Sequence, residues 1–330
     1  MENNYTRHYS VLYRECLEAF SKVNVESSNK YFADMTFGAG GHTTRIASEI
    51  PNAYVYSTDQ DPDAIANGEQ IINDKNLSDK ITLLKMNFEQ FPNWVTSSQP
   101  GLKFDGILMD LGVSSHHFDK FERGFSFRED APLDMRMECD NEEVPTAADI
   151  LNTYSEEDIA DIIYKYGEEH YSRRIARKII EFRSEHQISR TKELEEIVFI
   201  SYPKHLRHKK LHPATKTFQA LRIYVNRELE VLENTLVKLF ELLAPGGILQ
   251  VISFHSLEDR IVKHKFKEIF QNDKNTVKIL TKKPICPSEL EISENSRSRS
   301  AKLRIIQKID PDTQGGVVGK KNKKKNKSYT

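Results

Sequence analysis

A glycine-rich turn constrains the fold of this chain more than any other feature. The segment Asp34-Met35-Thr36-Phe37-Gly38-Ala39-Gly40-Gly41-His42 follows a short apolar run and leads directly into a helical pattern. Glycines in such a turn let the backbone approach a ligand closely and leave the first amides of the following helix facing it. The turn alone does not identify a ligand, because similar turns bind several cofactors or only allow tight packing.

Short apolar runs and helical stretches alternate around this turn. The runs cover residues 31–33, 53–56, 81–84 and 106–109, with helices expected at 43–49 and 63–73. This alternation predicts an α/β fold with a doubly wound parallel sheet. Further along, we expect one long helix over 215–243 that stops at Pro245-Gly246-Gly247, then a strand over 248–254 and a helix over 257–270. Strands near 276–281 and 302–308 bring the total to seven.

The middle of the chain has a different pattern, in which helix follows helix over 156–166, 172–184 and 192–200. Ser155, with Asp158 three residues later, has the spacing of a helix start. We therefore expect a sheet domain in two parts, 1–114 and 213–312, around a helical insertion, 115–212. Residues 313–330 are rich in Lys and Asn without periodicity and are expected to be a disordered tail.

Basic residues are clustered although the formal net charge is only −1. The clusters lie at 204–210, 297–304 and 320–325. Lys and Arg gain affinity for nucleic acids by releasing counterions from phosphates, so three clusters in one chain favour a nucleic-acid partner. A solvated surface is the alternative interpretation for any one of them.

Other features of the composition exclude several protein classes. The chain has no apolar run near the length of a membrane helix, and its start lacks the order of a signal peptide, so we expect a cytoplasmic protein without membrane contact. Cys16, Cys139 and Cys286 lie far apart, which argues against a zinc site and a disulfide framework. We expect no metal.

An acidic residue at the end of the second expected strand gives further evidence about the ligand of the glycine turn. Asp59 lies 21 residues after Gly38, the distance at which a carboxylate accepts hydrogen bonds from ribose hydroxyls. The ligand should therefore contain adenosine. The glycines do not complete the G-x-G-x-x-G of NAD enzymes, whereas Asp34 and the helix-start amides suit the amino-acid end of S-adenosylmethionine.

Long segments of the chain resemble one family, ribosomal RNA small subunit methyltransferase H (RsmH or MraW). The resemblance rests on the glycine turn and on segments spread from about Tyr5 to Gln307. These include Asp110-Leu111-Gly112-Val113-Ser114-Ser115, Arg123-Gly124-Phe125-Ser126-Phe127, Leu133-Asp134-Met135-Arg136-Met137, His212-Pro213-Ala214-Thr215-Lys216-Thr217-Phe218, Ser253-Phe254-His255-Ser256-Leu257-Glu258-Asp259-Arg260 and Arg297-Ser298-Arg299-Ser300-Ala301-Lys302-Leu303-Arg304.

The resemblance implies a seven-stranded Rossmann-like methyltransferase sheet, formed by the two parts of the sheet domain, with the inserted helical domain expected to recognise RNA. It also implies methylation of the exocyclic N4 amine of a cytidine in the decoding region of small-subunit rRNA, with S-adenosylmethionine as cofactor. The implied cofactor contacts are Gly40, Gly41, His42, Asp59, Phe88, Asp110 and His117. Two positions differ from the family, which usually has Ser-Ser-Pro-Gln where this chain has Ser114-Ser115-His116-His117, and Pro where this chain has Ser296.

Two residues are candidates to act on the cytosine itself. Asp110, at the fourth strand end, has three open roles: accepting a hydrogen bond from N4, holding the ammonium of the cofactor, or capping the strand. His255, after the fifth strand, is the second candidate; a structural hydrogen bond is its alternative role. Ser253 is a candidate to hydrogen-bond the ring, and Phe125 and Phe127 to stack on a cytosine that has left its own stack, or simply to belong to the core.

RNA contacts are expected at Lys216, Arg222, Arg297 and Arg299. The partner is small-subunit rRNA or the assembled small subunit, and the sequence leaves open which of these is used and whether the protein forms a homodimer. Two other functions remain as alternatives. A non-catalytic RNA-binding factor is disfavoured because the cofactor residues are present, and an NAD-dependent oxidoreductase because the pyrophosphate motif is incomplete.

Overall fold

A seven-stranded sheet forms one half of the protein. The computed structural model describes residues 10–23, 29–113 and 120–309. The strand order is β3-β2-β1-β4-β5-β7-β6, and β7 runs antiparallel to both of its neighbours. The strands are β1 (Lys30–Asp34), β2 (Ala53–Asp59), β3 (Ile81–Lys85), β4 (Phe104–Asp110), β5 (Leu243–Ser253), β6 (Val277–Ile279) and β7 (Lys302–Lys308).

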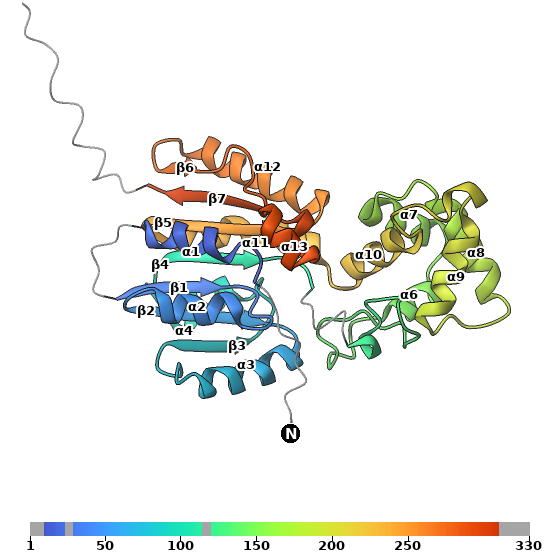
Figure 1. Ribbon diagram of the computed structural model, residues 1–330, viewed down its shortest axis with the longest axis horizontal. Helices are drawn as coiled ribbons and strands as arrows, with labels where there is room; N and C mark the ends of the chain where they lie inside the picture. The colour runs from blue at the N-terminus through green and yellow to red at the C-terminus, as the bar shows by residue number, and fades with distance from the viewer. Residues whose placement is uncertain (1–9, 24–28, 114–119, 310–330) are drawn as a thin grey trace, which may run out of the picture.

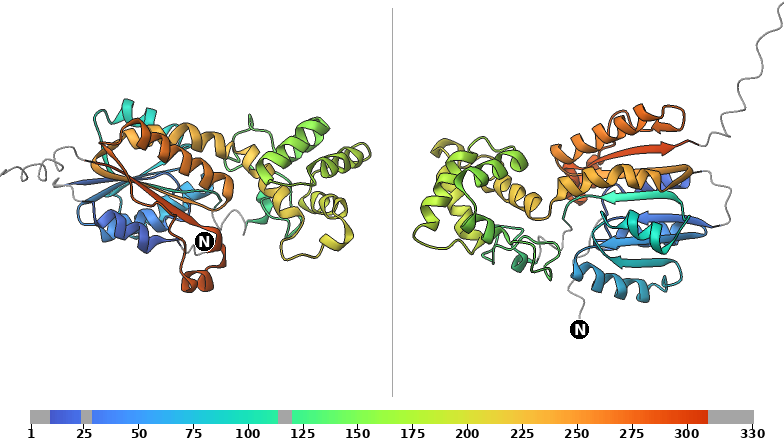
Figure 2. Two further views of the ribbon diagram at one scale, coloured as in Figure 1. Left: turned by 90° about the horizontal axis from the view of Figure 1, so that it is seen from above. Right: turned by 180° about the vertical axis from the view of Figure 1, so that it is seen from behind.

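Helices cover both faces of this sheet (Figure 2). On one face α1 (Tyr13–Ser21), α2 (Gly41–Glu49) and α3 (Pro62–Asp74) contribute to a hydrophobic cluster with the strands. On the other face α4 (Phe91–Ser98), α11 (Glu228–Glu241) and α12 (Ser256–Asn272) contribute to a second cluster. The expected doubly wound α/β fold is therefore confirmed.

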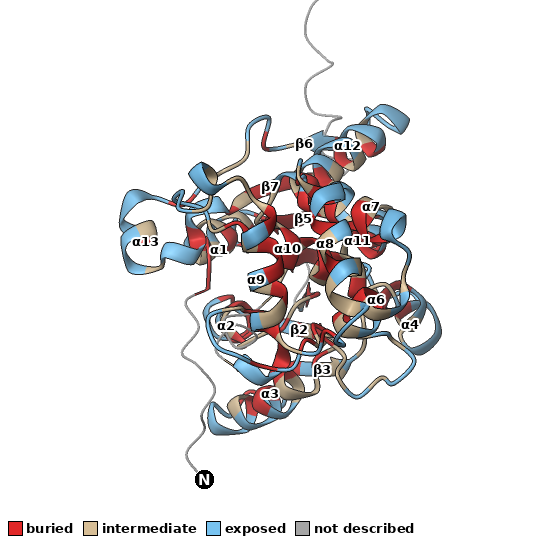
Figure 3. Cartoon of the chain, turned by 90° about the vertical axis from the view of Figure 1, so that its right-hand side faces the viewer, coloured by how far each residue is buried: buried red, intermediate tan, exposed pale blue. Residues whose placement is uncertain are grey.

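A helical unit lies beside the carboxyl ends of the parallel strands (Figure 1). Its helices are α6 (Ala147–Thr153), α7 (Glu156–Gly167), α8 (Ser172–Arg183), α9 (Thr191–Ser201) and α10 (Ala214–Val225). They share a third hydrophobic cluster, and α10 is largely buried within it (Figure 3). We therefore place α10 with the helical unit, beyond the boundary at residue 212 suggested by the sequence.

The expected single helix over 215–243 is wrong, because the chain breaks it into α10 and α11. Arg227 has a left-handed backbone with φ of 49°, which no helix interior tolerates. The side chain of Asn226 stabilises the break, since its Oδ1 accepts from the Met137 amide at 2.7 Å and its Nδ2 donates to the Met135 carbonyl at 2.8 Å. The pattern of apolar residues continues across the break, which is why the sequence alone did not reveal it.

Several local predictions are confirmed. The Ser155 side chain accepts from the Asp158 amide at the start of α7, and β7 has the predicted bounds. Helices α1, α4, α6 and α13 (Glu289–Glu294) were not predicted from the sequence. Three short 3-10 helices complete the described elements: η1 (Phe121–Arg123), η2 (Lys204–Leu206) and η3 (Ser296–Ser300).

Cys16, Cys139 and Cys286 are free thiols, and Cys16 is buried. Within the described ranges, none of the helices combines the length and the apolar character needed to cross a bilayer.

Candidate functional site

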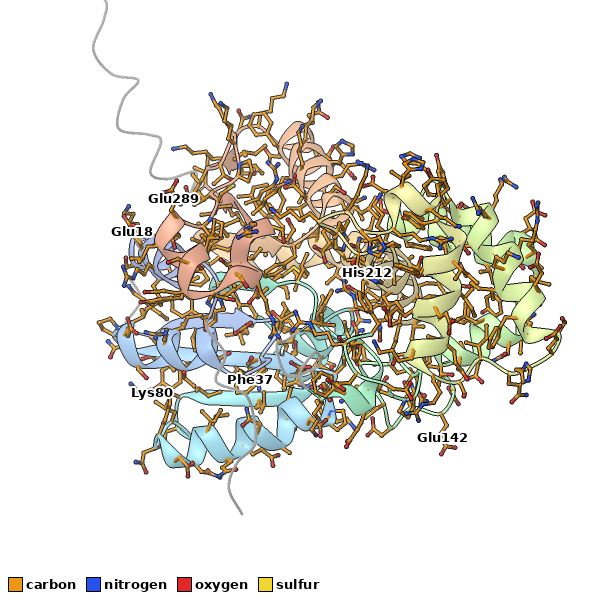
Figure 4. The ribbon with its side chains drawn as sticks, turned by 45° about the vertical axis from the view of Figure 1, so that its right-hand side comes forward. Glu18, Phe37, Lys80, Glu142, His212 and Glu289 are labelled. Carbon is orange, nitrogen blue, oxygen red and sulfur yellow. The ribbon has the colours of Figure 1, made fainter. Side chains whose placement is uncertain are left out.

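A cavity of about 530 Å³ lies where the sheet meets the helical unit. Strands β1 to β5 are parallel, so their carboxyl ends share one edge, the edge at which doubly wound folds bind ligands. One side of the cavity comes from the glycine turn and the ends of β2 and β4, the other from the loop at 125–128 and from α10. Figure 4 marks Phe37 on the sheet side and His212, just before α10, on the helical side.

The glycine turn adopts the conformation that its sequence predicts. Gly40 has φ of 73°, a left-handed conformation, and its amide donates to the Phe37 carbonyl at 2.7 Å. A side chain at Gly40 would place its Cβ 2.6 Å from the ring of Phe37. Gly41 starts α2 and lines the cavity together with Gly38, whereas Gly40 shapes the turn without lining it.

Asp59 ties the second strand end to this turn. Its Oδ2 accepts from the Gly38 amide at 2.8 Å and its Oδ1 from the Asp61 amide at 2.9 Å. Phe88 and Asn87 line the cavity beside it, and Asn87 Nδ2 donates to Gln60 Oε1 at 2.8 Å. This part of the cavity offers a carboxylate and an aromatic face, which suit the ribose and adenine of a nucleoside.

Asp110 and His42 form the inner wall of the cavity. His42 Nε2 lies 3.6 Å from Asp110 Oδ2, while Oδ1 of Asp110 is buried with no hydrogen-bond partner among the described residues. Burial, reinforced by the neighbouring Asp34 carboxyl, raises the pKa of Asp110 well above its ordinary value. A buried acceptor of this kind is suited to a cationic ligand.

Asp34 lies deeper in the protein than its sequence position led us to expect. It is fully buried, does not line the cavity, and accepts from Thr43 Oγ1 at 2.6 Å and from the Thr36 amide at 3.2 Å. Burial raises its pKa to about 7. Asp34 therefore supports the turn from behind, and direct contact with a cofactor ammonium is not what this arrangement favours.

His255 is a capping residue of α12 and does not line the cavity. Its Nδ1 accepts from the Glu258 amide at 3.4 Å, and its Nε2 lies 3.2 Å from Glu258 Oε1. Although burial opposes it, His255 together with Arg222 lowers the pKa of Glu258. The position favours the structural role over direct contact with a base. Ser253 is likewise buried outside the lining.

A buried charge cluster surrounds Glu258. Glu228, His255 and Glu258 bring potential metal-ligand atoms within 4.8 Å of one another. Arg222, however, already forms a bidentate pair with Glu228, with Nε to Oε1 at 2.7 Å and Nη2 to Oε2 at 2.9 Å. The guanidinium thus supplies the positive charge that these carboxylates need.

The four expected RNA contacts lie in different surroundings. Arg222 and Arg297 line the cavity, and Arg299 is exposed in η3. Lys216 donates to the Glu168 carbonyl at 2.8 Å. In the second basic cluster Arg304 is buried and pairs with Asp259, so this part of the cluster is structural. The third cluster and the tail lie outside the described residues.

Aromatic side chains line the helical side of the cavity. Phe125 is buried in the core of the helical unit, and Phe127 packs against it. The Phe127 ring centroid lies 4.8 Å from that of His212 and 5.0 Å from that of Phe218. The position of these rings is thus compatible with both expected roles, stacking on a cytosine and packing in the core. His117 lies outside the described residues.

Two features of the site were missed by sequence reasoning. Glu228 was not singled out, because only the folded chain brings α11 beside Arg222. Arg123 links the units: it donates to Asp61 Oδ1 at 3.1 Å and Asp63 Oδ2 at 2.9 Å, and also to the Arg136 and Met137 carbonyls. The sequence signal for this contact was an arginine within a segment of glycine and aromatic residues, together with acidic residues at the start of a helix elsewhere in the chain.

Strand order, antiparallel β7 and the cavity at the carboxyl edge define a Rossmann-like methyltransferase sheet with an inserted helical domain. The chain belongs to the MraW methylase family, whose model matches residues 5–309. It is 47% identical over 307 residues to a ribosomal RNA small subunit methyltransferase H from Synechococcus elongatus, covering 93% of this chain and 96% of that protein. A relative of the same description from Sulfurihydrogenibium is 47% identical over 302 residues, covering 92% and 99%.

Similarity to solved structures is much weaker. An rRNA methylase from Streptococcus thermophilus aligns with 94% of this chain and 99% of its own, with a TM-score of 0.43 and 10% identity. This likeness is too low to inform the function.

Proposed function

We propose that the protein transfers a methyl group from S-adenosylmethionine to the N4 amine of a cytidine in the decoding region of small-subunit rRNA. The observation that carries the proposal is one cavity that joins nucleoside-binding groups of the sheet to an aromatic and cationic wall of the helical unit. Membership in a methylase family and relatives described as small-subunit rRNA methyltransferases support it. Such an enzyme would work in the cytoplasm.

The residues at the sheet edge fit the proposed cofactor. Asp59 and Phe88 would bind ribose and adenine, and the amides of Gly41 and His42 at the start of α2 would face its carboxylate. Asp110 would hold the ammonium through its buried Oδ1. The bound cofactor would supply a sulfonium methyl group for in-line displacement.

The protein's own part in the reaction is positioning and proton acceptance. The amine of cytosine must leave the plane of its ring and lose a proton as the new bond forms. Of the two candidates for this proton, Asp110 and His255, Asp110 lines the cavity, and proton acceptance is the alternative to its role with the ammonium. Burial raises the pKa of Asp110, which would make its carboxylate a better base than that of an exposed aspartate. Phe125 and Phe127 would hold the flipped base.

Two measurements test the proposal. Calorimetry should show binding of S-adenosylmethionine and no binding of NAD, which separates a methyltransferase from an oxidoreductase and from a factor that binds only RNA. Mass spectrometry of small-subunit rRNA nucleosides from a deletion strain should show the loss of one N4-methylated cytidine. An unchanged nucleoside profile would contradict the substrate assignment while leaving the family membership intact.

A further inference from the structure

The pair formed by Arg222 and Glu228 lines the cavity, but the methyl transfer proposed above assigns it no role. Both side chains line the cavity, with exposed fractions of only 14% and 11%. Glu228 occupies Nε and one edge of Nη2. Arg222 Nη1 makes no hydrogen bond within the described ranges, so the outer edge of the guanidinium has donors to spare.

The pair is held rigidly. Arg222 is near the end of α10 and Glu228 is the first residue of α11, so the break at Asn226 and Arg227 turns the two side chains towards each other. Although burial opposes the charge, Glu228 raises the pKa of Arg222 further, so the guanidinium stays protonated. A bidentate carboxylate also fixes the plane of the guanidinium, and therefore the direction of its remaining donors.

A cytosine offers the matching acceptors. Its N4 amine is the group to be methylated, while N3 and O2 lie along the same edge and accept hydrogen bonds. Uracil has a donor at N3, which a guanidinium repels. A planar fork with donors on Nη1 and Nη2 can therefore recognise N3 and O2 of cytosine and reject uracil.

We propose that Arg222 reads the N3 and O2 edge of the target cytosine and that Glu228 is its positioning residue. The inference rests on the proposed function and makes the RNA contact expected at Arg222 a contact with the target base. It assigns the helical side of the cavity to the base, and the sheet side to the cofactor.

The test compares cytidine with 3-deazacytidine, which keeps the amine but replaces N3 by a C–H group, at the methylated position of the RNA substrate. Binding is measured for the full-length wild type, for Arg222→Lys, which keeps the charge and loses the fork, and for Glu228→Gln, which keeps the shape. Wild type should bind the deaza substrate at least about tenfold more weakly, because a site built for a hydrogen bond rejects an analogue that lacks it. In both variants this discrimination should fall towards onefold.

Arg227→Lys is the matched control, because Arg227 forms the same kind of bidentate pair with Glu230, but at an exposed position. It should keep the wild-type discrimination. Affinity for S-adenosylmethionine should be unchanged in every variant, and circular dichroism verifies folding.

Equal binding of the two substrates by wild type would overturn the inference even if no variant folds. Variants that keep the discrimination of wild type would overturn it too. Absence of any N4-methylation by wild type would instead refute the proposed function.

Discussion

At the residue scale, buried carboxyl groups dominate the chemistry of this site. Asp34 and Asp110 end adjacent parallel strands, and burial raises the pKa of each. Only Asp110 faces the cavity. The sequence could predict that acidic residues end these strands, but not which of them reaches the ligand, because that depends on packing behind the glycine turn.

The substitution Asp110→Asn separates two roles of this residue. It keeps an acceptor oxygen and removes the charge, so the dissociation constant of S-adenosylmethionine should rise at least as much as turnover falls, because the ammonium loses its counterion. Calorimetry and single-turnover kinetics on the one variant measure both. Asp105→Asn, at the opposite end of β4, is the control. Lost turnover with intact cofactor binding would assign Asp110 to the N4 amine instead.

Asp34 should make stability depend on pH. Its pKa rises from 3.8 to about 7 on folding, so the native state binds an extra proton between these values. Stability should therefore fall as the pH rises from about 4 to about 7, by up to about 1.4 kcal/mol per unit, and level off above. Asp34→Asn should reduce this slope in urea unfolding measured across the range, while Asp110, whose pKa is also raised, keeps its own contribution. A slope equal to that of wild type would show that other groups cause it.

At the scale of elements, the periodicity of the apolar residues predicted the type and position of most strands and helices. Strands β1 to β4 and β7, and helices α2, α3, α7, α8, α9 and α12, all lie where expected. Strand β5 instead begins at Leu243 and runs through Pro245-Gly246-Gly247, where the sequence predicted a stop before the strand. The break between α10 and α11 was missed, because it depends on a side chain bonding to a loop 89 residues away in the sequence. Likewise, the Arg222–Glu228 pair exists only because that break redirects the chain.

Asn226→Ala tests how much the break depends on this side chain. The substitution leaves the Met137 amide and the Met135 carbonyl without their partner, and should cost about 2 to 4 kcal/mol of unfolding free energy. Denaturant unfolding measures the loss. Asn234→Ala, at an exposed position in α11, should change stability by less than about 0.5 kcal/mol. Similar values for the two variants would mean that packing alone maintains the break.

At the scale of the whole molecule, two of the contacts between the helical unit and the sheet domain differ strongly in burial. Buried Arg123 bonds to Asp61 and Asp63 at the start of α3. Glu168, after α7, accepts from Ser256 Oγ at 2.7 Å and Arg260 Nη2 at 3.1 Å at an exposed position. Because the cavity needs both units, the rigidity of these contacts bears directly on the site.

The two contacts should differ greatly in strength. Arg123→Ala removes a guanidinium from the buried Asp61 carboxylate and should cost about 3 to 5 kcal/mol. Glu168→Ala removes only exposed contacts and should cost less than about 1 kcal/mol. Thermal unfolding gives the stabilities, and limited proteolysis shows whether the loop at 120–145 becomes accessible. Equal losses would show that the units are held by apolar packing, whereas a larger loss for Glu168→Ala would place the main joint at α12. Of these two variants, we expect only Arg123→Ala to weaken both cofactor and RNA binding, since Arg123 anchors the helical wall of the cavity to the helix that follows Asp59.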